Sequence, residues 1–261
     1  MNNLMGNQHN RTIKNILISQ PEPETPGKSP YHLMAEKLHV SILFRPFIKV
    51  EGLQAKDFRK SRINPLDYTA VIFTSRNAVN HFFRLCDELR AKMPQNTKYF
   101  CISEAIALYL QRFILFRKRK VFFDKTSSLN GLKDLLKKHR KTDKFLFPCA
   151  ADRKDNVEQY LVEENFNFSP AVMFETVPDK LSDIDISQYD MLVFFSPMGI
   201  KSLGENFPDF QQSDVVIGAF GPVTAKAVID AGLRLDFQAP LPGVPSITMA
   251  IEKYITEHTT A

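Results

Sequence analysis

The stretch from residue 188 to residue 203 constrains the fold more than any other part of the chain. Its apolar run, 191–195, is too short for a helix and is typical of a buried strand in a parallel sheet. Ser196 and Pro197 follow at once, and these residue types favour the N-cap and the first position of a helix. A strand that ends at a helix N-terminus exposes backbone N–H groups at the sheet edge where open α/β folds bind ligands.

The pattern occurs twice. In residues 67–82 an apolar strand again runs into a serine, and Phe73 and Ser75 align with Phe194 and Ser196. Further along, residues 100–107 align with residues 218–225 in the same way. Two matched pairs at similar offsets predict two similar α/β domains in one chain, whereas chance similarity of common strand–helix units is the alternative.

Strand and helix patterns alternate along both halves, which favours parallel sheets covered on both faces. Each domain has five candidate strands, so we expect an α/β protein of two flavodoxin-like domains joined by a two-stranded β linker. The inner domain is inserted into the outer one. The expected ranges are a disordered tail at 1–12, an outer domain at 13–44 and 179–261, linker strands at 45–57 and 173–178, and an inner domain at 58–172.

Composition indicates which cellular compartment and which kinds of partner fit the protein. The three cysteines lie far apart, which argues against a disulfide framework or a zinc site and fits a reducing cytoplasm. No segment has the length and apolarity of a signal peptide or a membrane span. The net charge of +5 includes basic runs at 117–120 and 137–141. We interpret these runs as solvated loops, and a nucleic-acid module has only this charge in its favour.

Several helix N-termini are expected at the carboxyl edges of the two sheets, in a cleft between the domains. Backbone N–H groups there suit a ligand with many carboxylates or phosphates, although each serine is also an ordinary helix cap. The histidine spacing matches no metal motif and no nucleotide-binding loop is present, so we expect no metal and no cofactor. The candidate binding residues are Ser75, Arg76, Asn77, Ser103, Glu104, Ala151, Asp152, Ser196, Pro197, Met198, Gly199, Gly221, Pro222 and Val223.

Four segments together resemble the uroporphyrinogen-III synthase family. They are D-Y-T-A-V-I-F-T-S-R-N-A-V, F-P-C-A-A-D-R-K-D, V-F-F-S-P-M-G-I and G-A-F-G-P-V-T-A-K-A-V-I-D-A-G-L. The resemblance implies a lyase of haem biosynthesis that needs no cofactor. It cyclises hydroxymethylbilane to uroporphyrinogen III, with loss of water and inversion of ring D. The implied partner is a small linear tetrapyrrole with eight carboxylates. Neither a membrane nor nucleic acid is expected as a partner, and the protein is expected to be a monomer.

The resemblance also indicates site residues. The family's G-P-T-T motif places its second threonine on Thr224 and its first on Val223. The family's tyrosine falls on Phe174, which cannot donate a proton, and further departures are Ile106, Ser103 and Gln20. A catalytically silent tetrapyrrole- or anion-binding protein on the same fold is therefore the alternative. At the turn after residue 195, we expect the amides of Met198 and Gly199 to bind a carboxylate while Ser196 shapes the turn.

Overall fold

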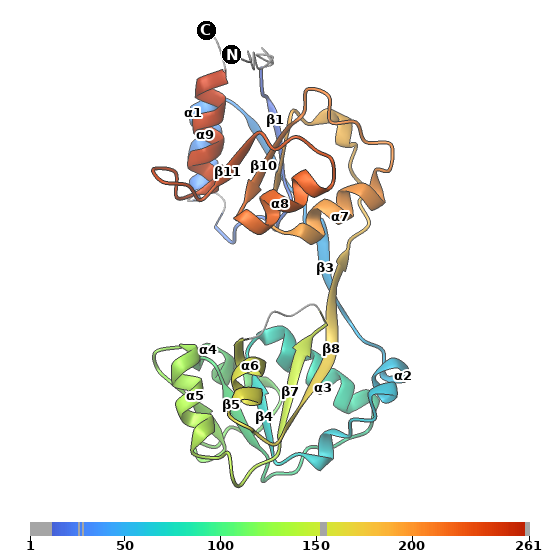
Figure 1. The fold of residues 1–261 in the computed structure, drawn as a ribbon, viewed down its shortest axis with the longest axis vertical. Coiled ribbons are helices and arrows are strands. Elements are labelled where there is room, and N and C mark those ends of the chain that lie inside the picture. Colours follow the sequence, from blue (N-terminus) through green and yellow to red (C-terminus); the bar gives the residue numbers. More distant parts are fainter. Residues whose placement is uncertain (1–11, 26, 28, 152–155, 259–261) are drawn as a thin grey trace. The chain divides into compact units, whose positions relative to one another are not determined.

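The computed structural model describes residues 12–25, 27, 29–151 and 156–258 (Figure 1). The chain forms two compact units. The outer unit comprises Met1–Lys49 and Val177–Ala261, and the inner unit comprises Val50–Thr176. The chain therefore enters the inner unit once and leaves it once, which makes the inner unit an insertion in the outer one.

The outer unit contains a five-stranded sheet in the order β11-β10-β9-β1-β2, and every neighbouring pair is parallel. In chain order this is 2-1-3-4-5, the flavodoxin arrangement. The apolar run expected after residue 190 is its central strand, and Leu192 pairs with Leu17. The strands are β1 (Asn15–Ile18), β2 (Ser41–Phe44), β9 (Met191–Phe194), β10 (Val216–Phe220) and β11 (Phe237–Ala239).

Helices cover both faces of the outer sheet. One core packs the buried Met34 of α1 and Ile251 of α9 against the sheet, and another packs Ile200 of α7 and Val228 of α8. Two separate cores on opposite faces explain why the strands read as continuous apolar runs. The helices are α1 (Pro30–Leu38), α7 (Pro197–Asn206), α8 (Pro222–Asp230) and α9 (Ile247–His258), with a short 3-10 turn, η5 (Ile186–Gln188), before β9.

The inner unit contains a six-stranded sheet in the order β3-β8-β7-β4-β5-β6. The β4–β5, β4–β7, β5–β6 and β7–β8 pairs are parallel. The strands are β3 (Ile48–Gly52), β4 (Ala70–Phe73), β5 (Lys98–Cys101), β6 (Val121–Phe123), β7 (Phe145–Ala150) and β8 (Phe168–Pro178). The five parallel strands have the chain order 3-2-1-4-5, which differs from the 2-1-3-4-5 order of the outer sheet.

The two sheets nevertheless place the matched sequences at matching positions. In each sheet the strand of the repeated pattern, β4 or β9, is central, and the next matched strand, β5 or β10, is its neighbour. The two strands on the other side of the centre come from the N-terminal segment in the outer unit. In the inner unit they come from the C-terminal strands β7 and β8. The two sheets thus share one spatial arrangement of parallel strands, but the chain begins at a different strand of that arrangement in each unit.

Strands β3 and β8 connect the units. Leu53 donates a backbone hydrogen bond to Met173 at 2.9 Å, and Asp179 donates one to Phe47 at 2.9 Å. The partner numbers rise on one strand as they fall on the other, so the pair is antiparallel. The returning linker strand was expected over residues 173–178. The structure has one continuous strand because β8 first pairs with β7 and then extends beyond it.

The inner sheet is also covered on both faces. Phe82 of α3 and Ala107 of α4 belong to one core, whereas Leu132 of α5 and Leu161 of α6 belong to another. The helices are α2 (Ala55–Phe58), α3 (Arg76–Glu88), α4 (Glu104–Tyr109), α5 (Leu129–Lys137) and α6 (Asn156–Glu163), with 3-10 turns η2 (Arg59–Ser61), η3 (Pro65–Asp67) and η4 (Leu110–Arg112).

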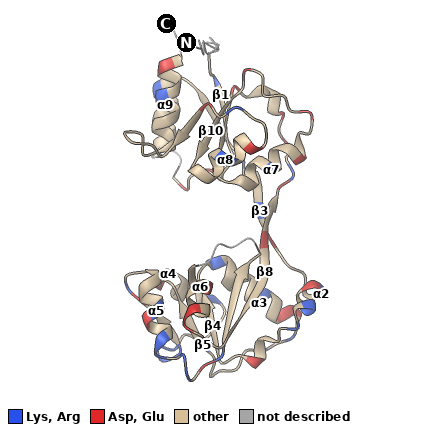
Figure 2. Ribbon diagram, in the orientation of Figure 1, with Lys and Arg blue, Asp and Glu red and all other residues tan. Residues whose placement is uncertain are grey.

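The cysteines are buried, and the basic runs lie mainly in turns, although Lys137 is the last residue of α5. Cys86, Cys101 and Cys149 are buried and form no disulfide, and burial raises the pKa of the Cys86 and Cys101 thiols to about 12. The basic runs occupy the turn before β6 and the end of α5, and Figure 2 shows basic residues near that end of α5. Within the described residues, no helix is long and apolar enough to span a bilayer.

Candidate functional site

The carboxyl edge of the outer sheet gathers the N-termini of three helices. The parallel strands β1, β9 and β10 all end at this edge, and α1, α7 and α8 begin from it. The first residues after β9 and β10 are Phe195-Ser196 and Gly221, and the sequence singled out Ser196 and Gly221. Backbone amides at such helix starts point outward and favour anions.

At the start of α7, Ser196 is the N-cap and accepts a hydrogen bond from one of the backbone N–H groups that would otherwise be free. Its Oγ accepts from the Gly199 amide at 3.2 Å, and its backbone oxygen lies 3.1 Å from the same nitrogen. The Gly199 amide is therefore not free to bind a carboxylate, contrary to the expectation from the sequence. The Met198 amide has no acceptor among the described residues, and Pro197 has no N–H to give. This turn thus offers one donor rather than two.

At the start of α8, no side chain caps the helix. Gly221 is the N-cap with φ +87° and ψ 148°, a conformation that L-residues rarely adopt. Its own amide donates to Ala239 at 2.6 Å, and Pro222 follows without an N–H. The amides of Val223 and Thr224 have no acceptor within the part of the chain that the structure describes. The α8 start therefore presents two adjacent free donors at the positive end of the helix dipole.

Thr224 adds a hydroxyl group to this turn. Its residue is only 3% exposed, yet no hydrogen bond to its Oγ1 is found among the described residues. Thr224 is not the helix cap, because the cap position is Gly221 and Thr224 lies three residues inside. A hydroxyl that lacks a protein partner and is not itself closed to solvent is available to a ligand.

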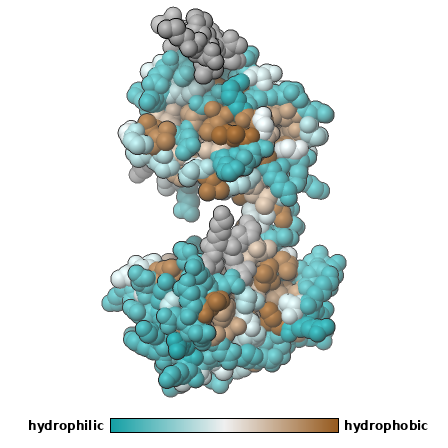
Figure 3. All heavy atoms as spheres, viewed as in Figure 1, coloured by the Kyte–Doolittle hydropathy of each residue, from teal (hydrophilic) through white to brown (hydrophobic). Residues whose placement is uncertain are grey.

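Aromatic side chains lie beside these donors. The rings of Phe195 and Phe220, which follow β9 and end β10, have centroids 5.9 Å apart. Phe220 is 37% exposed and Val223 is 59% exposed, so both place apolar surface at this edge. Figure 3 shows apolar surface over the part of the outer unit that contains α8. The edge therefore combines amide donors with an apolar surface that suits flat rings.

Tyr31 is a further polar group at this edge, and the sequence did not single it out. It lies in the first turn of α1, packs edge-on against Phe44 at 5.1 Å, and its hydroxyl accepts a 3.1 Å hydrogen bond from Gln20. Burial raises its pKa to about 12, with the Gln20 hydrogen bond opposing that shift. The phenol therefore stays protonated across the neutral range. It also lines a small cavity of about 200 Å³.

The inner unit has the equivalent edge, with more of its donors already used. Ser75 caps α3 by accepting from Ala78 at 3.0 Å, and Ser103 caps α4 by accepting from Ile106 at 3.3 Å. The amides of Arg76 and Asn77 have no acceptor among the described residues. At α4, the carboxylate of Glu104 occupies the first turn and competes with any incoming anion. The α3 start is therefore the better donor group of this unit.

The remaining candidates of the inner unit lie elsewhere. The Ala151 amide donates to the Phe174 carbonyl at 3.0 Å and is not free, and Asp152 lies outside the described residues. Phe174 is 7% exposed and its ring stacks on His81 with centroids 5.1 Å apart. Burial and the nearby Arg84 lower the pKa of His81. The Phe174 side chain therefore belongs to the core of the inner unit.

The structure thus separates the sequence candidates into groups. Met198, Gly221, Pro222, Val223 and Thr224 share the carboxyl edge of the outer sheet, whereas Ser75, Arg76 and Asn77 share that of the inner sheet. The sequence missed three aromatic residues, Tyr31, Phe195 and Phe220. A usable signal existed, because each directly follows a strand, ends one, or opens the helix after a strand.

Comparison with known families gives one match over most of the chain. A family model described as uroporphyrinogen-III synthase HemD matches residues 30–248. No match was found among curated proteins.

Solved structures give a likeness of the fold. A uroporphyrinogen-III synthetase from Helicobacter pylori 26695 is 17% identical, with a TM-score of 0.54, over 94% of this chain and 100% of that one. A mutant uroporphyrinogen III synthase from the extremely thermophilic bacterium Thermus thermophilus is 15% identical, with a TM-score of 0.47, over 94% of this chain and 99% of that one. At such identities the likeness to the Helicobacter structure concerns the fold alone.

Proposed function

The chain belongs to the uroporphyrinogen-III synthase family, and from this premise we propose how its own residues bind and close a linear tetrapyrrole. The family comprises cyclising lyases of tetrapyrrole biosynthesis. They convert hydroxymethylbilane to uroporphyrinogen III and release one water. The substrate combines carboxylates with four pyrrole rings, and both groups need a partner on the protein.

The single observation that carries the proposal is the open start of α8. Two adjacent amides, those of Val223 and Thr224, lack protein acceptors among the described residues, and the Thr224 hydroxyl lies beside them. A carboxylate bound there gains hydrogen bonds and the favourable helix dipole. The Met198 amide adds a donor on the neighbouring helix, and Phe220 supplies an apolar surface for a pyrrole ring. In the inner unit, Arg76 and Asn77 take the same role at α3.

Binding of this kind also serves the chemistry. The C–O bond of the ring A hydroxymethyl group breaks, the oxygen leaves as water after taking up a proton, and ring D bonds to the freed carbon. Attack through the substituted carbon of ring D gives a spiro intermediate, and its rearrangement inverts that ring. We propose that the protein holds the linear tetrapyrrole so that this carbon of ring D is the one within reach of the freed carbon. The reacting atoms are then already positioned, which lowers the entropic cost of bringing them together.

A proton donor other than Phe174 is required. Phe174 carries no proton and its ring is buried against His81. Tyr31 and Thr224 are hydroxyl donors at the carboxyl edge of the outer sheet, and the raised pKa of Tyr31 keeps its proton in place at neutral pH. We assign to Thr224 the hydrogen bond that assists the departing hydroxyl. Tyr31 donates a second hydrogen bond to the substrate.

Tyr31→Phe is expected to lower kcat/KM by about threefold to tenfold, because a neutral hydrogen bond is worth roughly 0.5–1.5 kcal/mol. The ring and its contact with Phe44 remain, so the melting temperature should change little. Tyr254→Phe, in α9 of the same unit, is the matched control and should retain full turnover. A Tyr31→Phe enzyme with wild-type kcat/KM would remove Tyr31 from the site.

Product isomers test the function itself. Hydroxymethylbilane closes without help to the type I isomer, whereas the proposed activity gives type III. The expected result is type III as the main product, in proportion to enzyme, by chromatography of the oxidised porphyrins. If only type I forms, at the rate of a protein-free control, the synthase assignment is wrong.

A silent binding protein is the second candidate, and the departures at Phe174 and Ile106 favour it. Both side chains are buried in the inner core, so neither blocks a free amide. The two candidate functions separate in the same assay, because a silent protein would bind hydroxymethylbilane yet leave the type I product unchanged.

We also propose that the protein works as a monomer in the cytoplasm. The buried cysteines without disulfides support a reducing compartment. Light scattering after size exclusion, which should give one chain mass, tests the monomer.

A further inference from the structure

A cavity of the inner unit lies at the opposite edge of the sheet from the helix N-termini. Its volume is about 660 Å³, within the usual range for small-molecule sites. The lining residues come from the end of α3, the segment before β5, and the segment before β6. These segments precede the strands, whereas Ser75 and Ser103 follow them. The cavity is therefore separate from the edge to which we assign substrate binding.

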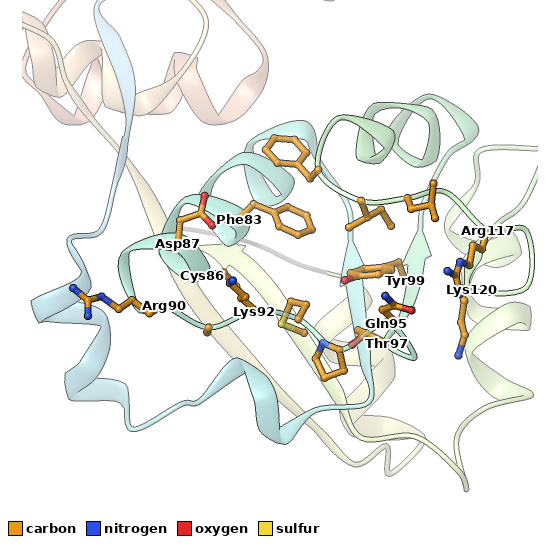
Figure 4. Close-up of a pocket in the computed structure, with 16 residues that line it drawn as sticks. Phe83, Cys86, Asp87, Arg90, Lys92, Gln95, Thr97, Tyr99, Arg117 and Lys120 are labelled. Atoms are coloured by element: carbon orange, nitrogen blue, oxygen red, sulfur yellow. The ribbon is translucent and has the colours of Figure 1, made fainter.

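The walls of this cavity are aromatic. Phe83 of α3 stacks on Phe113 with centroids 4.8 Å apart and planes 10° from parallel, and Tyr99 of β5 lies 6.4 Å from Phe83. Figure 4 shows Tyr99 in the middle of the lining residues. Phe113 is 38% exposed and Leu115 is 77% exposed, so apolar surface faces solvent here. Such walls suit a ring-containing molecule.

The floor contains a polar group that lacks a partner. Thr97 is 3% exposed, and its Oγ1 is the one buried side-chain oxygen or nitrogen among the described residues without a hydrogen bond. That oxygen is itself closed to solvent, so the hydroxyl that a ligand can reach on this wall is a different one. The Tyr99 phenol, whose pKa burial raises, also has no hydrogen-bond partner in the described chain.

The charge around the cavity is mostly positive. Four cationic side chains line it, and Asp87 is the one carboxylate among the lining residues. In Figure 4, Arg90 and Lys92 lie toward one end, and Arg117 and Lys120 lie toward the other. Lys120 donates to the Asn96 carbonyl at 2.8 Å, whereas Arg90, Lys92 and Arg117 have no ion pair among the described residues. Three unpaired cations around an apolar cavity favour an anionic ligand.

We infer that this cavity is a second binding site of the protein, which takes a ring-containing organic anion. The apolar ring system lies against Phe83, Tyr99 and Phe113, an acceptor atom reaches the Tyr99 phenol, and the anionic group pairs with the cations at the rim. The site also gives a role to the basic run that begins at Arg117, which substrate binding at the other edge does not use.

The probe for this site is 8-anilinonaphthalene-1-sulfonate, which has fused rings and one sulfonate. Fluorescence titration and calorimetry of the full chain should show one molecule bound per chain. Leu115→Glu places a negative charge at the exposed rim without touching the core, and should weaken binding at least tenfold. Val162→Glu is the matched control, because Val162 is 61% exposed in α6 of the same unit. It should leave the affinity unchanged.

A second pair of variants tests the cations. Arg117→Gln should weaken binding by about threefold at low salt, and Lys138→Gln, in the other basic run, should have no effect. Both Leu115→Glu and Arg117→Gln should retain wild-type turnover of hydroxymethylbilane, so this site and the synthase activity can fail separately. Several molecules bound per chain, or an affinity that Leu115→Glu and Val162→Glu reduce equally, would show adventitious binding and overturn the proposal.

Discussion

Thr224→Val is expected to lower kcat/KM for hydroxymethylbilane by about tenfold to a hundredfold while the protein stays folded. Valine has nearly the shape of threonine, so the packing of this 3%-exposed residue is kept and only the hydroxyl is lost. A hydrogen bond to a charged or developing charged group is worth about 1.5–3 kcal/mol, which corresponds to this loss. The measurement is the initial rate of type III isomer formation, with thermal unfolding in parallel.

Thr256→Val is the matched control for that substitution. Thr256 is an exposed residue of α9 in the same unit, and its hydroxyl donates to the Glu252 carbonyl at 2.8 Å. The control should show wild-type kinetics. If Thr224→Val also turns over at the wild-type rate, Thr224 is a packing residue and the amides alone hold the substrate.

Gly221→Ala is expected to reduce both activity and stability, with the larger effect on activity. Gly221 adopts φ +87°, and an alanine there is strained by about 1–3 kcal/mol even though an added Cβ would meet no atom within 4 Å. Relief of the strain rotates the turn and redirects the free amides of Val223 and Thr224. We expect kcat/KM to fall by at least tenfold, by the same isomer assay.

Gly232→Ala separates strain from loss of the donors. Gly232 follows α8 with φ +75°, and an added Cβ there also has no atom within 4 Å. Its stability cost should therefore resemble that of Gly221→Ala, whereas it lies at the far end of the helix from the free amides. Equal losses of activity in the two variants would mean that strain, and not the placement of the Val223 and Thr224 amides, explains the result.

The strand–helix units could be predicted from the sequence because their signals are local. A short apolar run followed by Ser-Pro determines β9 and the start of α7, and the same logic applies to β4 and Ser75. The strand order of the inner sheet could not be predicted this way. Whether β7 and β8 lie beside β4 depends on pairing between distant segments, and five apolar strands fit either order equally well.

For the candidate site too, local features could be predicted from the sequence, whereas contacts between distant segments could not. The sequence identified the helix starts and Thr224, since residue type and position relative to a strand are enough for that. It could not tell which amides are free. Gly199 and Ala151 are used by Ser196 and by the Phe174 carbonyl, and those bonds exist only once the turn and the ladder have formed.

By itself, the sequence determined that this is an α/β chain of two related halves, with helix starts after its strands and a family pattern that includes Thr224. Tertiary structure decided which of those starts remain open, that Phe174 is buried against His81, and that Tyr31 and Phe220 join the edge. The physical reason is the distance along the chain over which each effect acts. Strand and cap propensities act within a few residues, whereas the freedom of a donor depends on neighbours that only folding brings within hydrogen-bond distance.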